Sequence, residues 1–129
     1  MSGSPGSDLR FVGVSLGCAD PAALADFYLR LLGGRLVWSR PSSVGVQVPG
    51  VLLIAQRVEG HRPPDWPGAS VVHLDLTAGN ELDEPERRAL ELGARLADPQ
   101  YDPRWRVLLD PAGHPFCVTT MASVLDPPA

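Results

Sequence analysis

The sequence predicts an α+β fold made of two copies of a βαβββ module. Two observations lead to this prediction. Hydrophobic patterns typical of strands and helices follow one another in the order β-α-β-β-β, and the same order then starts again. Residues 12–16 resemble residues 72–76, and residues 32–36 resemble residues 92–96, so both pairs are 60 positions apart (72 − 12 and 92 − 32). One offset shared by two separate segments indicates an internal repeat.

Residues 9–58 are expected to form the first module. Apolar and small residues alternate over residues 11–16, which is typical of a half-buried strand. Asp20 and Pro21 then predict a helix start, because aspartate is a good N-cap and proline fits the first helical turn. The apolar side chains that follow at helical spacing form one core-facing stripe: Leu24, Phe27, Tyr28, Leu31 and Leu32.

This helix should end at Gly33, because glycine readily adopts the left-handed conformation that closes a helix. The Pro49-Gly50 pair predicts a tight turn between two strands of the same module. Three strands are expected after the helix, at residues 35–38, 44–48 and 51–58.

Residues 70–121 are expected to form the second module, which opens with a strand over residues 71–77. Asp83 is expected to cap a helix that ends near Leu92, with Glu86 three residues on completing a capping box. Three strands are expected to follow, at residues 95–97, 105–109 and 116–121.

The remaining segments are expected to lie outside the modules. Residues 59–69 are rich in proline, which removes the hydrogen-bond donors of a strand, so they predict a stiff connector. Residues 1–8 are expected to be a flexible polar lead, and residues 122–129 a frayed tail. The domain itself is therefore expected to span residues 9–121.

Composition excludes several classes of function. All 11 basic side chains are arginine, so mechanisms that need a lysine Schiff base or a P-loop lysine are excluded. The formal net charge of −4 argues against nucleic acid and anionic membranes as partners. With no long apolar run and no signal-peptide pattern, we expect a cytoplasmic protein. Cys18 and Cys117 lie in no paired motif, so we expect them to be reduced and buried.

Strand alternation predicts which side chains turn away from the helices. The apolar residues of each opening strand suit the helix-packed face, so the residues between them should line the opposite, concave face of a curved sheet. That face is expected to enclose a pocket between the modules. The polar side chains expected there are Ser15, His73, Asp75, Cys117 and Thr119.

The chain resembles the glyoxalase/bleomycin-resistance (vicinal oxygen chelate) superfamily, in its glyoxalase-like subgroup, over roughly residues 9–121. The resemblance rests on the first strand and helix up to Phe27-Tyr28, on the second opening strand at residues 72–76, and on the Asp-Pro-x-Gly turn within residues 109–116. It implies two βαβββ modules with the helices on the outer face of a curved mixed sheet. It also implies a homodimer.

The resemblance implies a divalent metal on the concave face, held from the first and last strands of each module. In this chain the four ligand positions fall on Gly13, His73, Cys117 and Ile54, with Gln56 as the alternative to Ile54. Glycine and isoleucine cannot bind metal. We therefore expect a degenerate site without a metal cofactor, and His73 and Cys117 as the ligands if a divalent ion is held. In that case a third ligand would come from Gln56, Glu59 or a second chain.

Other side chains are candidates for contacts with a ligand. Trp66 in the connector is a candidate lid or interface residue, and Trp105 beside Arg106 is a candidate anchor for a planar or carboxylate ligand. Hydrogen bonding within the fold is the alternative for His73, and exposed strand polarity is the alternative for Asp75. His61 and His114 are expected to face solvent. The expected ligand contacts are Ser15, Gln56, Trp66, His73, Trp105, Arg106, Cys117 and Thr119.

The function expected from these residues is binding of a small apolar or aromatic metabolite between the modules. If the chain is an enzyme, the resemblance implies a glyoxalase-like lyase, isomerase or dioxygenase, with His73 and Asp75 as the catalytic candidates. The further alternative is a non-catalytic protein that sequesters its ligand, as resistance-type relatives do.

Overall fold

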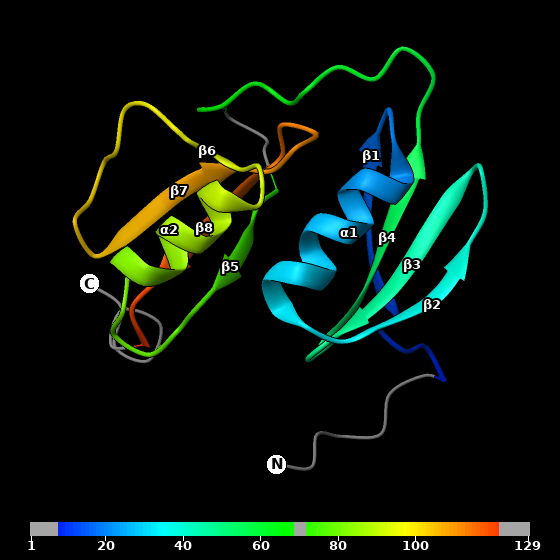
Figure 1. Ribbon diagram of the computed structural model, residues 1–129, viewed down its shortest axis with the longest axis horizontal. Coiled ribbons are helices and arrows are strands. Elements are labelled where there is room, and N and C mark those ends of the chain that lie inside the picture. The colour runs from blue at the N-terminus through cyan, green and yellow to red at the C-terminus, as the bar shows by residue number, and fades with distance from the viewer. Residues whose placement is uncertain (1–7, 69–71, 122–129) are drawn as a thin grey trace.

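The computed structural model describes residues 8–68 and 72–121, so most of the expected lead and all of the expected tail lie outside the described residues. The expected α+β fold of two βαβββ modules is confirmed, and Figure 1 shows the two modules side by side. Their elements follow in chain order: β1 (Gly13–Cys18), α1 (Pro21–Leu32), β2 (Arg35–Ser39), β3 (Ser43–Val48), β4 (Val51–Arg57), β5 (Leu74–Leu76), α2 (Asp83–Glu91), β6 (Arg95–Leu96), β7 (Trp105–Leu109) and β8 (Pro115–Thr119).

Each module forms its own four-stranded mixed sheet. The strand orders are β1-β4-β3-β2 and β5-β8-β7-β6, so the two modules share one topology. In both sheets the first strand runs parallel to the last, and the remaining pairs are antiparallel. As a result, β1 and β5 each form an edge of their sheet.

The first helix starts as its sequence predicts. The carboxylate of Asp20 accepts a hydrogen bond from the backbone N–H of Ala23 at 3.1 Å, and Pro21 occupies the first turn. The apolar stripe of α1 contributes Leu24, Phe27 and Tyr28 to the core, where each is at most 2% exposed. Burial of this stripe, rather than helix propensity alone, holds α1 on its sheet.

The second helix starts differently from the prediction. The N-cap is Leu82, no side chain caps the helix, and Asp83 is its first residue, so the expected capping box is wrong. The reason is a competing partner, because Asp83 and Glu86 both pair with the guanidinium of Arg106 on β7, at 3.0 and 2.8 Å. These ion pairs fasten α2 to its sheet.

The modules share one hydrophobic core. The ring of Phe27 on α1 lies 5.9 Å from that of Phe116 on β8, and the Tyr28 hydroxyl donates a 2.6 Å hydrogen bond to the buried Asp110 carboxylate.

The expectation that His61 and His114 face solvent is wrong, since both are half-buried. The Nε2 atom of His114 lies 2.6 Å from the Gly17 carbonyl oxygen, and that of His61 lies 2.9 Å from the Ala112 carbonyl oxygen.

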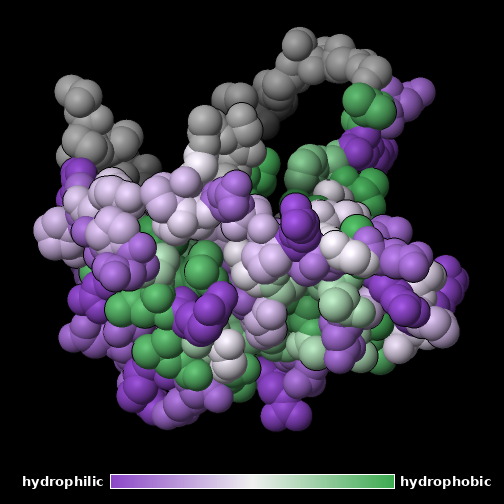
Figure 2. All heavy atoms as spheres, turned by 90° about the horizontal axis from the view of Figure 1, so that it is seen from above, coloured by the Kyte–Doolittle hydropathy of each residue, from purple (hydrophilic) through white to green (hydrophobic). Residues whose placement is uncertain are grey.

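The surface mixes apolar and polar residues, and both helices are short. On the face shown in Figure 2, apolar residues form small patches separated by polar ones. Neither helix of the described residues is long and apolar enough to cross a membrane.

Candidate functional site

Two hollows in the described residues are candidates for a binding site. A cavity of about 320 Å³ lies where α1 meets the second module, and its lining is mostly apolar, with Leu31, Leu76 and Phe116 among its residues. A larger cavity of about 550 Å³ lies on the opposite face of the second sheet, and its lining includes ionisable groups. The residues around the second cavity are Trp66, His73, Asp75, Tyr101, Trp105, Val107, Cys117 and Thr119.

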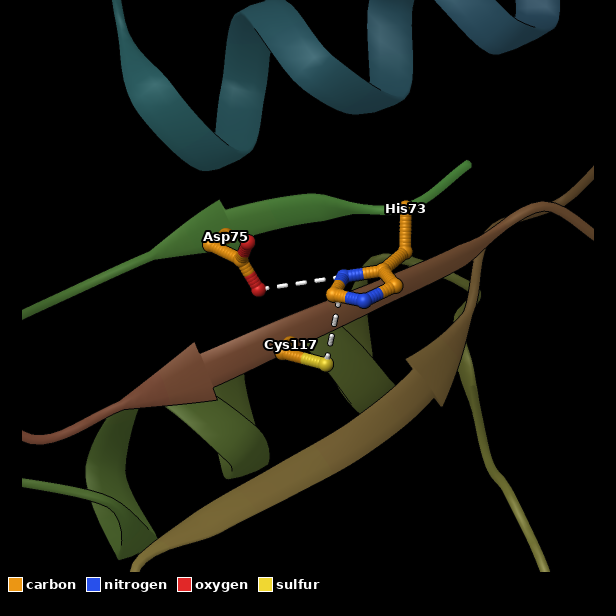
Figure 3. Close-up of side chains that lie close together, drawn as sticks. All are labelled: His73, Asp75 and Cys117. Atoms are coloured by element: carbon orange, nitrogen blue, oxygen red, sulfur yellow. Dashed lines mark hydrogen bonds and ion pairs between the residues drawn. The ribbon is translucent and has the colours of Figure 1, made fainter. Parts of the chain in front are cut away.

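We call this second cavity the module-two pocket. Strand alternation creates it, because the apolar side chains of β5 and β8 pack toward α2 and leave the intervening residues on the free face. Figure 3 shows His73, Asp75 and Cys117 in front of the sheet, with α2 behind it. The expected face is thus the one that carries the polar groups, and Tyr101 is a lining residue that sequence reasoning missed.

The two modules differ at this face. Asp75 pairs with Cys117 across β5 and β8, and the equivalent pair across β1 and β4 is Ser15 with Ile54. The first sheet therefore has no ionisable side chain at the position where the second has two. This register agrees with the sequence expectation that Ile54 corresponds to Cys117.

Not every expected ligand contact lines the module-two pocket. Ser15 and Gln56 are exposed on the first sheet, and neither is part of the lining. Arg106 is directed to α2 by its ion pairs with Asp83 and Glu86, so the expected Arg106 contact with a ligand is not found there. The pocket is formed by the second module and the connector residue Trp66 rather than between the two modules of one chain.

His73, Asp75 and Cys117 lie in direct contact. The Nδ1 atom of His73 is 3.1 Å from a carboxylate oxygen of Asp75 and 3.7 Å from the Sγ atom of Cys117. The three donor atoms all lie within 4.8 Å of one another. Sequence reasoning placed these residues on one face, but it looked elsewhere for the third metal ligand, at Gln56, Glu59 or a second chain, and so missed Asp75.

Burial decides the ionisation of the thiol. Cys117 is only 5% exposed, and burial, followed by the nearby negative charge of Asp75, raises the pKa of its thiol to about 12. At neutral pH the side chain is therefore a neutral thiol, which is a much weaker nucleophile than a thiolate. Both cysteines are free and buried, as expected.

Aromatic rings enclose the polar cluster. The ring of Trp66 lies edge-on to that of His73, with 6.0 Å between the ring centres. The ring of Trp105 carries the guanidinium of Arg104 at 5.1 Å, and Asp102 holds that guanidinium through two hydrogen bonds. The resulting site has apolar aromatic walls and a small group of polar side chains, an arrangement common in pockets for small molecules.

Comparison with known proteins identifies the family. The model of the glyoxalase-like domain matches residues 13–119, which is most of the chain. The chain belongs to the glyoxalase-like domain family. Its βαβββ repeat and the Asp-Pro-x-Gly turn are the features from which the sequence indicated this superfamily. A comparison with curated protein sequences found no match.

Several solved structures have the same fold as this glyoxalase-like domain. The fosfomycin resistance protein FosX from Listeria monocytogenes, solved with Mn(II) and sulfate, is 13% identical, with 90% of this chain and 94% of that one covered and a TM-score of 0.67. Lactoylglutathione lyase from Agrobacterium tumefaciens is 19% identical, with 87% and 93% covered and a TM-score of 0.61. TioX from Micromonospora sp. ML1 is 22% identical, with 86% and 98% covered and a TM-score of 0.60.

The Mn(II) of the FosX structure raises the question of which ion the residues of this glyoxalase-like domain could hold. Mn(II) prefers oxygen and nitrogen ligands in open octahedral sites. The first module provides no donor at the Gly13 and Ile54 positions, and the second provides a nitrogen, an oxygen and a sulfur. The residues present therefore fit a divalent ion, but a different class of ion from Mn(II).

Proposed function

We propose that this glyoxalase-like domain binds a small apolar or aromatic molecule in the module-two pocket, with His73 as the main polar contact. The observation that carries the proposal is the composition of this one cavity of about 550 Å³, where Trp66, Tyr101 and Trp105 surround a polar floor. Flat aromatic walls favour planar or apolar ligands, and a few polar groups fix their orientation.

An unpaired donor at the pocket wall supports a ligand with an oxygen or nitrogen acceptor. Among residues 8–68 and 72–121, the indole N–H of Trp66 is buried and has no acceptor. A buried donor without a partner is unfavourable by about 1–3 kcal/mol. A ligand that carries a hydroxyl or carbonyl group near Trp66 would remove this penalty on binding.

The binding proposal is tested with 2-naphthol as a planar probe that carries one hydroxyl group. We expect isothermal titration calorimetry to show binding that Trp105→Leu weakens by about five- to tenfold, because leucine keeps the apolar contact but loses the flat ring. The matched control is Trp38→Phe, since Trp38 packs on Gly45 in the first sheet and does not line the pocket.

Two results would contradict the proposal. One is equal affinity of Trp105→Leu and the unaltered chain, and the other is an equal loss in Trp38→Phe. Native mass spectrometry of the purified chain adds a second measurement. A retained and chemically unchanged molecule would favour sequestration, the resistance-type alternative, over turnover.

A metal-dependent lyase or isomerase of the glyoxalase type is the second candidate. The observation that favours it is the cluster of His73, Asp75 and Cys117 at the pocket floor. Three protein ligands and one open position are typical of catalytic metal sites. A metal there would polarise a substrate oxygen, and the aromatic walls would hold the rest of the substrate.

A homodimer is the proposed assembly. β1 forms an open edge of its sheet with no charged residue, and the exposed Phe11 and Val12 precede it. β5 forms the corresponding edge of the second sheet, and Val72 before it is 80% exposed. β5 carries the charged Asp75, whereas an uncharged edge strand such as β1 usually needs a cover, and a second copy of the chain would provide one.

A further inference from the structure

The pocket floor brings three different donor elements to one point. Figure 3 shows the imidazole of His73, the carboxylate of Asp75 and the thiol of Cys117 directed toward one another. Asp75 lies on β5, Cys117 on β8, and His73 immediately before β5, so two neighbouring parallel strands position all three. Cys117 is buried, whereas His73 and Asp75 keep side-chain exposures of 35% and 58%.

The same ring nitrogen faces both partners, and this excludes a hydrogen-bonded relay. In a Cys-His-Asp relay one ring nitrogen contacts the sulfur and the other contacts the carboxylate. Here Nδ1 of His73 lies 3.1 Å from Asp75 and also 3.7 Å from Cys117. One nitrogen is either a donor to the carboxylate or an acceptor from the thiol, so it cannot pass a proton between them. A shared cation satisfies all three atoms at once.

The separations agree with tetrahedral coordination. Typical zinc distances are about 2.3 Å to sulfur and about 2.0–2.2 Å to nitrogen and oxygen. At tetrahedral angles these distances place nitrogen and oxygen about 3.4 Å apart, and nitrogen and sulfur about 3.6 Å apart. The nitrogen–oxygen and nitrogen–sulfur separations in the cluster are 3.1 and 3.7 Å, and the oxygen–sulfur separation is at most 4.8 Å, so small adjustments allow the cluster to hold such an ion.

We propose that His73, Asp75 and Cys117 form a three-ligand site for a thiophilic divalent cation of the Zn²⁺ class, with the fourth position open to the module-two pocket. Sulfur, nitrogen and oxygen together favour Zn²⁺ or Co²⁺ over Mn²⁺ and Mg²⁺. This inference rests on the proposed pocket only for the open position, since the three ligands come from the protein itself.

Binding at this site releases one proton. The thiol of Cys117 loses its proton as the sulfur–metal bond forms, and the proton passes to the solvent buffer. Asp75 binds as a carboxylate, and His73 binds through the lone pair of Nδ1. The bound ion thus has two anionic ligands and one neutral ligand, which neutralise its charge.

Cobalt binding tests the site directly. The full-length chain, treated with a chelator and dialysed, is titrated with Co²⁺, which has an absorption band from sulfur-to-cobalt charge transfer only when a thiolate is bound. We expect this band to saturate at one ion per chain, and we expect Zn²⁺ to remove it. We expect Mn²⁺ to remove it only at concentrations roughly 100-fold higher.

Two cysteine variants provide a matched pair. Cys117→Ser should lose the charge-transfer band, whereas Cys18→Ser should keep it, because Cys18 is buried elsewhere and is not in the cluster. Asp75→Asn changes a largely exposed residue, so the fold should persist while Zn²⁺ affinity falls roughly 10- to 100-fold. Circular dichroism of each variant checks folding.

Several outcomes would overturn the metal site. They are the absence of the band in the unaltered chain, a band that depends on Cys18 rather than Cys117, unchanged Zn²⁺ affinity in Asp75→Asn, and equal affinities for Mn²⁺ and Zn²⁺. The 2-naphthol titration is repeated on metal-free protein. If the metal site fails by one of these outcomes, binding of 2-naphthol to the metal-free protein would still leave the proposed function intact. If the metal binds and 2-naphthol does not, the metal site stands and the proposed function fails.

Discussion

At the residue scale, one hydrogen bond connects the two modules through the core. The Tyr28 hydroxyl on α1 donates to Oδ2 of Asp110, and both residues are 1% exposed. The other oxygen of Asp110 accepts the backbone N–H groups of Ala112 and His114, so this carboxylate also holds the turn before β8. A tyrosine that sequence reasoning assigned to the core stripe thus has a polar role as well.

Tyr28→Phe is expected to lower the free energy of unfolding by about 1–3 kcal/mol, because it leaves a buried carboxylate oxygen without its donor. Chemical denaturation followed by circular dichroism measures this loss. The control is Tyr101→Phe, whose side chain is 60% exposed and for which the expected change is within about 0.5 kcal/mol. Equal effects of the two substitutions would show that the Tyr28 hydroxyl contributes nothing.

The same residue predicts a dependence on alkaline pH. Burial, followed by the charge of Asp110, raises the pKa of Tyr28 well above its usual value of 10. The folded chain therefore keeps this proton to higher pH than the unfolded chain does. Stability from this group is complete below about pH 10 and falls as pH rises toward the folded pKa. The alkaline loss should be smaller in Tyr28→Phe, and an identical loss would contradict the assignment.

At the element scale, the closing turns of the two modules are equivalent but differ in their surroundings. Gly50 precedes β4 with φ +90°, and Gly113 precedes β8 with φ +89°. A Cβ atom at Gly50 would meet open space, whereas one at Gly113 would lie 2.5 Å from the Cβ atom of Pro63 in the connector. The connector thus packs on the second turn only.

The two turns predict that alanine in place of Gly113 destabilises the fold more than alanine in place of Gly50. Gly50→Ala and Gly113→Ala both place a side chain in the left-handed region, at a cost of about 1–2 kcal/mol each. Gly113→Ala also forces Pro63 to move, which adds roughly 1–3 kcal/mol. Thermal and urea unfolding of the two variants measures the difference. Equal destabilisation would mean that the connector does not pack on this turn in solution.

At the scale of the whole molecule, the open edges of the two sheets are the basis of the proposed homodimer. Val12 and Val72 occupy equivalent positions in the repeat, and they are 70% and 80% exposed just before the edge strands β1 and β5. Among the described residues, the only named strand that pairs with β1 is β4 and the only one that pairs with β5 is β8, so the outer side of each edge strand has no strand beside it. A dimer that covers these edges would bring module one of one chain and module two of another together.

Sedimentation velocity tests this assembly. The mass derived from the sedimentation of the unaltered chain is expected to be twice the 13.8 kDa mass of one chain. Val12→Arg should shift it toward the monomer, because a buried arginine without a partner is unfavourable in an interface. Leu36→Arg is the control, since Leu36 is 54% exposed on β2 at the opposite edge of the same sheet. The edge proposal fails if the control dissociates equally, or if the unaltered chain is a monomer.

The sequence by itself determined the two modules, most helix and strand positions and the face that carries His73, Asp75 and Cys117. The helix and strand positions depend on local signals, namely the period of the hydrophobic residues and the Asp20 cap, which act between residues close in sequence. The 60-residue offset indicates that the second module repeats the signals of the first. The tertiary structure alone decided the partners of these side chains. It directed Arg106 to α2, set Cys117 beside His73 and built the pocket from one module and the connector. Contacts between residues distant in sequence depend on packing and register, which no local pattern specifies.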